Sequence, residues 1–381
     1  MSEKELEENK MQREEKASIA GHGSIAHPKI HTQFQPILLK GHERSITTVK
    51  YNADGDLIFT ASKDTHPTVW YAESGERLGT FNHHKGAVWD IDPSFDSRYL
   101  LTASGDGNAR LFNATTGEFL ARMPHKGVVR CVSWGDGTKQ FATAADPMHT
   151  RELGTINIFD FPTADILAEE PSPHQDIEFR APAYTPKREI NVDDNDKAVC
   201  LGFTIGDQYI IAGFDSGNLV KYDVETGKEV MRKKIHTDRI NRISFNREKS
   251  LLITASKDCT ATLLDPFTFQ IIRVFKTERP INGAVISPTH PHIIIGGGQD
   301  AQSVTTTSAS QGKFESRFFH MVYGTEFGRV KGHFGPINAL AVHPFGKSYA
   351  SGSEDGFIRL HTFDVAYLTA PDYVDSDIKS N

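Results

Sequence analysis

The chain has 381 residues, of which 24% are charged and 10% aromatic, and its formal net charge at pH 7 is −7. This is the composition of an ordinary globular protein. Its acidic balance argues against strong autonomous nucleic-acid binding, which needs an excess of Lys and Arg. No apolar run reaches the roughly 18 residues of a membrane-spanning helix. The three cysteines, Cys131, Cys200 and Cys259, fit neither a zinc spacing nor a disulfide framework, which favours a reducing compartment such as the cytoplasm.

Residues 1–33 differ in composition from the remainder of the chain. Their start, MSEKELEENKMQREEKA, is rich in charge and poor in apolar side chains. The apolar residues are too sparse for the heptad of a coiled coil, and the apolar stretch of a signal peptide is missing. We therefore expect a disordered or loosely helical N-terminal extension, with a helix that orders on a partner as the alternative.

The remainder of the chain, from residue 34 to 365, repeats one spacing. In four segments a His is followed 22 residues later by an Asp, and a Ser stands two residues before that Asp. The four sets are His42, Ser62 and Asp64; His84, Ser104 and Asp106; His236, Ser256 and Asp258; and His333, Ser353 and Asp355. A large side chain follows six residues after each Asp, and it is Trp70 in the first set. Successive starts at His42, His84 and His125 are 42 and 41 residues apart. A period of this length is typical of the WD40 repeat, in which four strands form one blade of a β-propeller.

The resemblance to WD40 repeats gives these residues structural roles. In that pattern the Asp lies in a tight turn and hydrogen-bonds the His, which in turn reaches the Ser and the aromatic side chain. Polar groups that are buried without such partners cost about 1–3 kcal/mol each. We therefore expect the four histidines to stabilise blades, and we expect no catalytic residue, no metal site and no cofactor.

Three further blades are expected between these four, which gives an all-β, seven-bladed propeller. Blade three starts at His125, blade four has Ser216 where the Asp is expected, and blade six lacks the His–Asp spacing. The segment FQPILLKG at 34–41 has no blade of its own and should close the ring as the outer strand of blade seven. Residues 161–197 contain five prolines and are expected to form a surface insertion between blades three and four. The C-terminal tail, 366–381, offers only a weak strand.

Motifs that carry catalysis are missing from the sequence. It contains no GxxxxGK[ST] phosphate loop, no HExxH and no GxSxG elbow, and no set of nucleophile, base and orienting residue stands out. We therefore expect a binding protein and not an enzyme.

One part of the sequence is more specific than the WD40 pattern. Residues 278–361 contain ERPINGAVISP, GGGQDAQSVTTTSASQGKFESRFFH and EFGRVKGHFGPINALAVHPFGKSYASGSEDGFIRLH. These strings, together with PILLKGHERSIT near the N-terminus, closely resemble the i subunits of eukaryotic translation initiation factor three. The resemblance implies a cytoplasmic, non-catalytic scaffold that binds a C-terminal helical segment of the b subunit and the g subunit. It also implies a role in pre-initiation complex assembly and scanning on the small ribosomal subunit.

The resemblance further implies that the b-subunit segment lies against blades five and six. We expect Arg242, Lys257, Asp258 and Arg279 to lie there at loops or strand ends and to form a mixed-charge surface for an amphipathic helix. The alternative is that Asp258 only closes its own blade and that Arg242 and Lys257 are solvated. A different cytosolic WD40 adaptor, such as a ubiquitin-ligase substrate receptor or a G-protein-β-like scaffold, is the alternative function.

Overall fold

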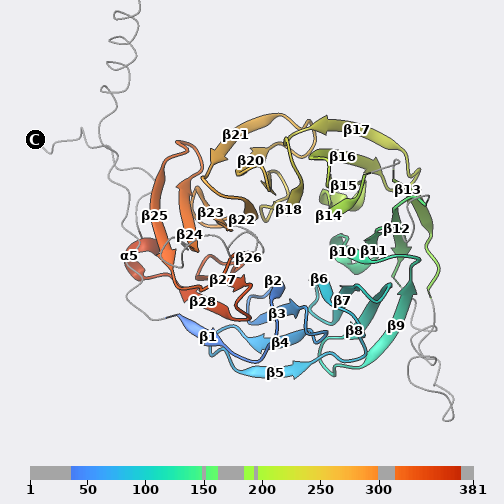
Figure 1. Cartoon of the computed structure of the whole chain (residues 1–381), viewed down its shortest axis with the longest axis horizontal. Coiled ribbons are helices and arrows are strands. Elements are labelled where there is room, and N and C mark those ends of the chain that lie inside the picture. Colours follow the sequence, from blue (N-terminus) through green and yellow to red (C-terminus); the bar gives the residue numbers. More distant parts are fainter. Residues whose placement is uncertain (1–35, 148–151, 162–183, 193–195, 299–313, 370–381) are drawn as a thin grey trace, which may run out of the picture.

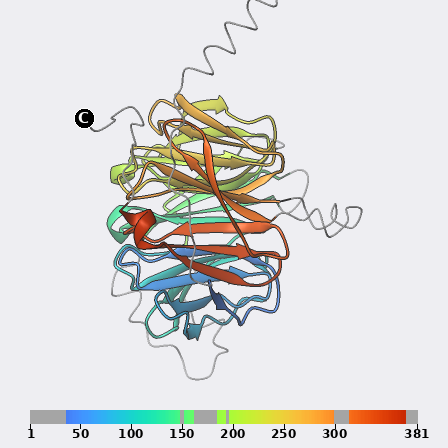
Figure 2. The same cartoon turned by 90° about the vertical axis from the view of Figure 1, so that its left-hand side faces the viewer.

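A computed structural model describes residues 36–147, 152–161, 184–192, 196–298 and 314–369. These residues form seven four-stranded antiparallel sheets that are arranged as blades around a central channel (Figure 1). The predicted all-β, seven-bladed propeller is therefore confirmed. In the edge-on view the sheets run through the thickness of the ring (Figure 2).

Each blade is a meander whose first strand lines the channel and whose last strand lies at the outer rim. Blades one and two consist of β2 (Ile46–Tyr51), β3 (Leu57–Ser62), β4 (Thr68–Tyr71) and β5 (Arg77–Thr80), and of β6 (Val88–Pro93), β7 (Tyr99–Ser104), β8 (Asn108–Asn113) and β9 (Phe119–Pro124). Blades three and four consist of β10 (Val129–Trp134), β11 (Gln140–Ala145), β12 (Thr155–Asp160) and β13 (Arg188–Asn191), and of β14 (Ala198–Phe203), β15 (Tyr209–Phe214), β16 (Asn218–Asp223) and β17 (Glu229–Lys234).

The second half of the ring follows the same order. Blades five and six consist of β18 (Ile240–Phe245), β19 (Leu252–Ser256), β20 (Thr260–Leu264) and β21 (Ile271–Lys276), and of β22 (Ile281–Ile286), β23 (His292–Gly297), β24 (Glu315–His320) and β25 (Glu326–Lys331). Blade seven combines β26 (Ile337–Val342), β27 (Ser348–Ser353) and β28 (Ile358–Thr362) with β1 (Ile37–Leu39). Two short 3₁₀ turns, η1 (Asp136–Thr138) and η2 (Ile205–Asp207), follow β10 and β14.

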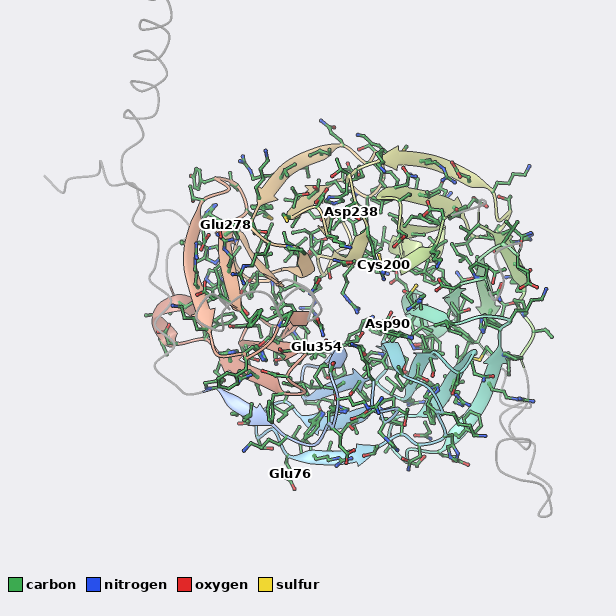
Figure 3. All side chains as sticks on the ribbon, in the orientation of Figure 1. Glu76, Asp90, Cys200, Asp238, Glu278 and Glu354 are labelled. Carbon is green, nitrogen blue, oxygen red and sulfur yellow. The ribbon has the colours of Figure 1, made fainter. Side chains whose placement is uncertain are left out.

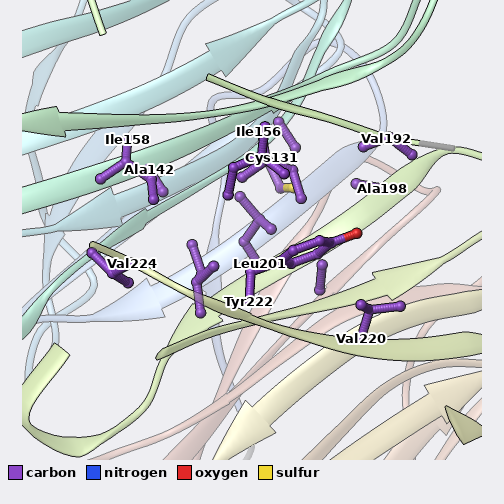
Figure 4. Close-up of a cluster of buried hydrophobic side chains, with 14 of the residues drawn as sticks. Cys131, Ala142, Ile156, Ile158, Val192, Ala198, Leu201, Val220, Tyr222 and Val224 are labelled. Carbon is purple, nitrogen blue, oxygen red and sulfur yellow. The ribbon is translucent and has the colours of Figure 1, made fainter. Parts of the chain in front are cut away.

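The middle strands are buried on both faces because each blade is covered by its two neighbours. In β3, LIFTAS, every residue after Leu57 is buried, so the strand is a nearly continuous apolar run and not an alternating one. Side chains of adjacent sheets interdigitate, as Figure 4 shows for the cluster between blades three and four, which includes Ile156, Ile158, Val220 and Tyr222. The hydrophobic core is thus divided among the blade interfaces.

The ring is closed by the N-terminal strand, as the sequence predicts. β1 pairs with β28 in antiparallel register, with Ile37 opposite Leu360 and Leu39 opposite Ile358. Leu39 is fully buried. Without this pairing the outer edge of β28 would present unpaired backbone groups.

The proline-rich stretch differs from its predicted form in its last part. Residues 188–191 form β13, which pairs with β12 as the outer strand of blade three, so the stretch 161–197 is not wholly an insertion between blades. The five prolines of the stretch all precede Arg188, and the sequence REIN has no proline to remove a ladder hydrogen bond. Residues 162–183 lie outside the described residues.

The chain after blade seven forms a helical turn and not a weak strand. In α5 (Val365–Leu368) the Asp364 side chain accepts a hydrogen bond from the Tyr367 amide at 2.7 Å, as an N-cap does. Tyr367 is buried, and its hydroxyl lies 2.9 Å from His292 Nδ1 in blade six. Figure 1 shows α5 beside β25 and β28. The propeller therefore extends beyond residue 365, while the predictions for 1–33 and 370–381 concern segments outside the described residues.

Candidate partner-binding surface

The four His–Asp pairs lie on one face of the ring, where each blade is joined to the next. We call this the network face. The Asp Oδ2 lies within hydrogen-bond distance of the His Nδ1 in each pair: 2.7 Å for His42 and Asp64, 3.1 Å for His84 and Asp106, 3.0 Å for His236 and Asp258, and 3.1 Å for His333 and Asp355. The same carboxylate oxygen accepts the backbone N–H of the residue after the His, such as Glu43 at 3.1 Å. The pairs thus tie the loop that enters a blade to a turn within it.

The serines have a different partner from the expected one. Ser62 Oγ donates to the Arg44 carbonyl at 3.0 Å and accepts the Asp64 N–H at 3.1 Å, so it does not contact the His. The corresponding donations come from Ser104, Ser256 and Ser353, to the carbonyls of Gly86, Asp238 and Gly335. The hydroxyl that faces the His Nε2 belongs instead to the residue 18 positions after it: Thr60, Thr102, Thr254 and Ser351, at 2.6–2.8 Å.

This hydroxyl connects the His to the aromatic residue of blade one. Trp70 Nε1 donates to Thr60 Oγ1 at 2.9 Å, and the same oxygen lies 2.8 Å from His42 Nε2. The sequence carries a signal for this role, because a Thr or Ser recurs at a constant distance from each His. The pattern of four Asp–Ser pairs obscured it.

The electrostatics of these pairs suit a structural role. Burial lowers the pKa of His84, His236 and His333, so each ring is neutral at pH 7, with one nitrogen that donates and one that accepts. Nδ1 faces the Asp and Nε2 faces the hydroxyl. Burial alone would raise the pKa of Asp106, but hydrogen bonds from His84 and the Lys85 amide outweigh it and hold the pKa well below its usual value. Both ring nitrogens are therefore already used.

Two buried arginines belong to these networks and are not evident from the His–Asp spacing. Arg110 Nη1 lies 2.6 Å from Asp106 Oδ2 in blade two, and Arg359 Nη1 lies 3.2 Å from Asp355 Oδ2 in blade seven. Each arginine is four residues after its Asp, a position that differs from blade to blade. Within the described residues no group of three or more His, Cys, Asp and Glu side chains could hold a metal ion.

Arg242 lies in a different place from the predicted one. It stands inside β18, the channel-lining strand of blade five, and not at a loop or a strand end. Its Nη1 donates to Asp90 Oδ1 in blade two at 3.2 Å, and its Nη2 donates to Thr48 Oγ1 and to the Thr47 carbonyl in blade one at 2.9 and 3.2 Å. Figure 3 shows Asp90 at the edge of the channel. Arg242 therefore links three blades across the channel.

Lys257, Asp258 and Arg279 do lie on the network face near blades five and six. Lys257 is exposed in the turn between β19 and β20. Asp258 is engaged by His236, by the Thr237 amide at 3.0 Å and by Thr260, so it closes its own network. Arg279 lies in the link between β21 and β22. Of the four predicted residues, Lys257 and Arg279 present charge to this face.

Arg279 borders a cleft of about 480 Å³, which we call the blade-six cleft. It is lined by Glu278, Arg279, Gly296–Gly298, Glu315, Arg317 and Arg329, among others. Thr277, at the position of the network His, donates instead to the Arg279 carbonyl at 2.7 Å. Among the described residues blade six has no His at this position, and the cleft is rimmed by both signs of charge. Such a surface can accept a partner segment of mixed charge.

Comparison with known proteins supports the resemblance to the i subunits of eukaryotic translation initiation factor three. The family model EIF3I matches residues 34–371. The chain is 45% identical over 332 residues to eukaryotic translation initiation factor 3 subunit I of Drosophila willistoni, covering 87% of this chain and 98% of the relative. It is 43% identical to the same subunit of Bombyx mori over 336 residues, covering 88% of this chain and 97% of the relative. The Xenopus laevis subunit is 43% identical over 334 residues, covering 88% of this chain and 98% of the relative.

The fold and the comparisons agree. The described part of the chain holds no helix with the length and apolarity needed to cross a membrane. The seven blades and the ring closure by β1 lie inside the segment that the family model matches. The chain therefore belongs to the family of eukaryotic translation initiation factor 3 subunit I.

Proposed function

We propose that this protein is a non-catalytic, cytoplasmic scaffold that binds the C-terminal segment of the b subunit and the g subunit of initiation factor 3. In that role it supports pre-initiation complex assembly and scanning on the small ribosomal subunit. The observation that carries the proposal is the match to subunit I over nearly the whole length of the relatives. The described structure is consistent with a scaffold, because its network histidines are engaged within the blades.

The geometry favours the network face of blades five and six as the b-subunit surface. Lys257 is exposed there, and the blade-six cleft next to it brings Arg279, Arg317 and Arg329 together with Glu278 and Glu315. An amphipathic helix that carries both arginines and acids would find complementary charges on this surface. Arg242 is not part of the proposed contact, because its guanidinium is engaged in the channel.

The proposal is tested by titrating the purified full chain with a peptide of the C-terminal segment of the b subunit in a calorimeter. Lys257→Glu and Arg279→Glu should each weaken binding at least about tenfold, since each reverses a charge at the surface. Lys228→Glu is the matched control, because Lys228 is an exposed lysine in the turn between β16 and β17 and should leave the affinity unchanged.

The outcomes separate the function from its location. Failure of the wild-type chain to bind either the b or the g subunit would contradict the scaffold function. Full binding by both Lys257→Glu and Arg279→Glu would leave the scaffold function in place and would show that the b-subunit segment binds elsewhere.

A further inference from the structure

The outer edge of blade five is an exposed apolar strand. β21, with the sequence IIRVFK, pairs with β20 alone among the described residues. Its Ile271, Ile272 and Val274 are 41%, 51% and 42% exposed. Among the described outer strands, only β21 and the three-residue β1 lack Gly, Pro and acidic residues. An outer strand of this kind is a template for the addition of another strand.

Blade two shows how such an edge is extended. Its outer strand, β9, accepts a further piece of chain, because the Tyr184 amide donates to the Arg122 carbonyl at 2.9 Å. Arg122 stands opposite Arg110, and Val274 stands opposite Thr262. Arg110 and Thr262 are equivalent, because each lies opposite the Thr that faces the network His of its own blade. The Val274 carbonyl therefore points outward, as the Arg122 carbonyl does.

The hydrogen bonds at the end of β21 lead to the same orientation. The Thr277 amide, just after the strand, donates inward to the Cys259 carbonyl at 2.9 Å. Backbone groups of successive residues alternate between the two sides of a strand, so those of Val274 and Lys276 point away from β20. At the register of Lys276, blade two has Pro124, which has no amide hydrogen. Blade five thus keeps an outward N–H that blade two lacks.

The charged side chains of β21 are both positive. They are Arg273 and Lys276, and Lys233 of blade four reaches the turn between β20 and β21. Phe275 is buried in the cluster between blades five and six, so alternation places Val274 and Lys276 together on the other side of the strand. A strand added to this edge would match an apolar side chain with Val274 and an acidic one with Lys276.

We propose that the outer edge of blade five binds an extended segment of a partner protein, with alternating apolar and acidic residues, which adds to β21 as a fifth strand. Backbone hydrogen bonds to Val274 and Lys276 would provide affinity, and the alternating side chains would provide specificity. A second copy of this chain fits less well, because pairing two β21 strands gathers four positive side chains and no acid. The proposal goes beyond the scaffold function, since β21 lies at the outer rim (Figure 1) and not on the network face.

The test begins with a display selection of short peptides on the immobilised full chain. Two libraries alternate apolar residues with charged ones, which are Asp and Glu in the first library and Lys and Arg in the second. Only the acidic library should yield binders. The tightest acidic peptide is then synthesised with a fluorescein label, and fluorescence anisotropy measures its dissociation constant for the purified chain and its variants.

Three variants of the chain examine the edge. Lys276→Pro removes the outward N–H and the charge, whereas Lys276→Gln removes the charge alone. The first should bind the peptide at least about tenfold more weakly than the second. Val274→Glu should bind at least about tenfold more weakly than the wild-type chain. Val230→Glu is the matched control, because Val230 is 49% exposed on β17, the outer strand of blade four, and should leave the affinity unchanged. Circular dichroism checks that each variant is folded.

N-methylation of every second peptide amide separates strand addition from simple coverage of the apolar residues. Only one of the two alternating sets of amides faces β21 in a paired strand. Methylation of that set should weaken binding at least about tenfold, and methylation of the other set less than about twofold. Equal effects of the two sets, equal binding by Lys276→Pro and Lys276→Gln, or binders from the basic library would overturn the proposal. A dimer in light scattering that Lys276→Pro abolishes would also overturn it, in favour of a second copy.

Discussion

At the scale of single residues, the hydroxyl of Thr60 is the centre of the blade-one network. It accepts from Trp70 Nε1, contacts His42 Nε2 and lies 3.2 Å from the Thr68 carbonyl, and it is fully buried. Ser62 makes two bonds, to the Arg44 carbonyl and the Asp64 amide. We expect Thr60→Val to lower the free energy of unfolding by about 2–3 kcal/mol and Ser62→Ala by about 1 kcal/mol, because the first leaves two buried side chains unpaired.

Urea-induced unfolding of the two variants measures this difference. Replacing Thr116 by Val is a suitable control, because this threonine is exposed in the turn after β8 and its loss should change stability by less than about 0.5 kcal/mol. A larger loss in Ser62→Ala than in Thr60→Val would mean that the serine, and not the threonine, holds the network together.

His361 makes stability depend on pH. It is 4% exposed and stacks on Tyr349 with ring centroids 4.7 Å apart, and burial, together with His333 and Arg359, lowers its pKa to about 3. In the unfolded chain its pKa is about 6.5. Below that value the unfolded state binds a proton that the folded state does not, so this contribution to stability is present above pH 6.5 and is lost as the pH falls towards 3.

The matched variant is His361→Phe, which keeps a ring against Tyr349 but cannot take up a proton. Between pH 7.5 and 4.5 the free energy of unfolding of the wild-type chain should fall by about 3 kcal/mol more than that of the variant. Urea titrations at the two pH values measure the difference. The same loss in both chains would show that His361 is protonated in the folded protein or is not the group responsible.

At the scale of elements, β1 is expected to hold the ring closed. Its Leu39 belongs to a cluster with Ile46, Trp70, Ile358 and Leu360, which spans blades one and seven. Deletion of residues 1–39 removes this side chain and uncovers the edge of β28. Loss of a buried leucine alone costs about 2–5 kcal/mol, so Tm should fall by at least about 5 °C. Deletion of residues 1–33 is the control, and equal melting temperatures for the two deletions would refute the closure argument.

The elements that the sequence predicts are those with a local or periodic signal. The four His–Asp spacings locate four blades, and FQPILLKG locates β1 because no other blade can use it. β13 has four residues and follows a proline-rich stretch, so its strand character comes only from pairing with β12. Likewise α5 is placed by Tyr367 and His292, which are 75 residues apart. Such contacts leave no trace in the local sequence.

In the candidate site, too, positions with a local sequence signal were predicted and positions set by long-range contacts were not. Lys257 and Arg279 lie in links between strands, where the sequence predicts them, and their role in partner binding stays a prediction. The position of Arg242 was wrong, since the direction of its side chain depends on blades one and two, about 152–195 residues away. The blade-six cleft could be anticipated only from the missing network His of that blade, and its charge follows from the folded arrangement.

At the scale of the whole molecule, the blades are joined by a chain of side-chain hydrogen bonds near the network face of the channel. Four side chains each donate to the backbone carbonyl of the first residue in the next inner strand, at 2.6–3.0 Å. The pairs are Asn241 with Ile281, Asn282 with Ile337, Asn338 with Ile46, and Thr47 with Val88. This chain runs from blade five through blade seven to blade two. It makes these blades depend on one another, so they should unfold together.

Arg242 adds a link across the channel, from blade five to Asp90 in blade two. The Asp90 side chain is only 9% exposed, so removal of the guanidinium leaves a largely buried carboxylate without its cation. We expect Arg242→Met and Asp90→Asn each to lower the free energy of unfolding by about 1–3 kcal/mol. The double variant should lose at least about 1 kcal/mol less than the sum, because both changes remove the same interaction.

The control for this cycle is Arg98→Met, because the Arg98 side chain is 78% exposed and lies 3.9 Å from Asp96, and its loss should cost less than about 0.5 kcal/mol. Urea-induced unfolding provides all four free energies of the cycle. Strict additivity would mean that the two residues stabilise their blades independently and that the channel is not bridged.

Since Arg242 faces the channel, Arg242→Met should also bind the b-subunit segment as tightly as the wild-type chain does, unlike Arg279→Glu. Reduced b-subunit binding by Arg242→Met would instead extend the proposed contact surface from the blade-six cleft into the channel.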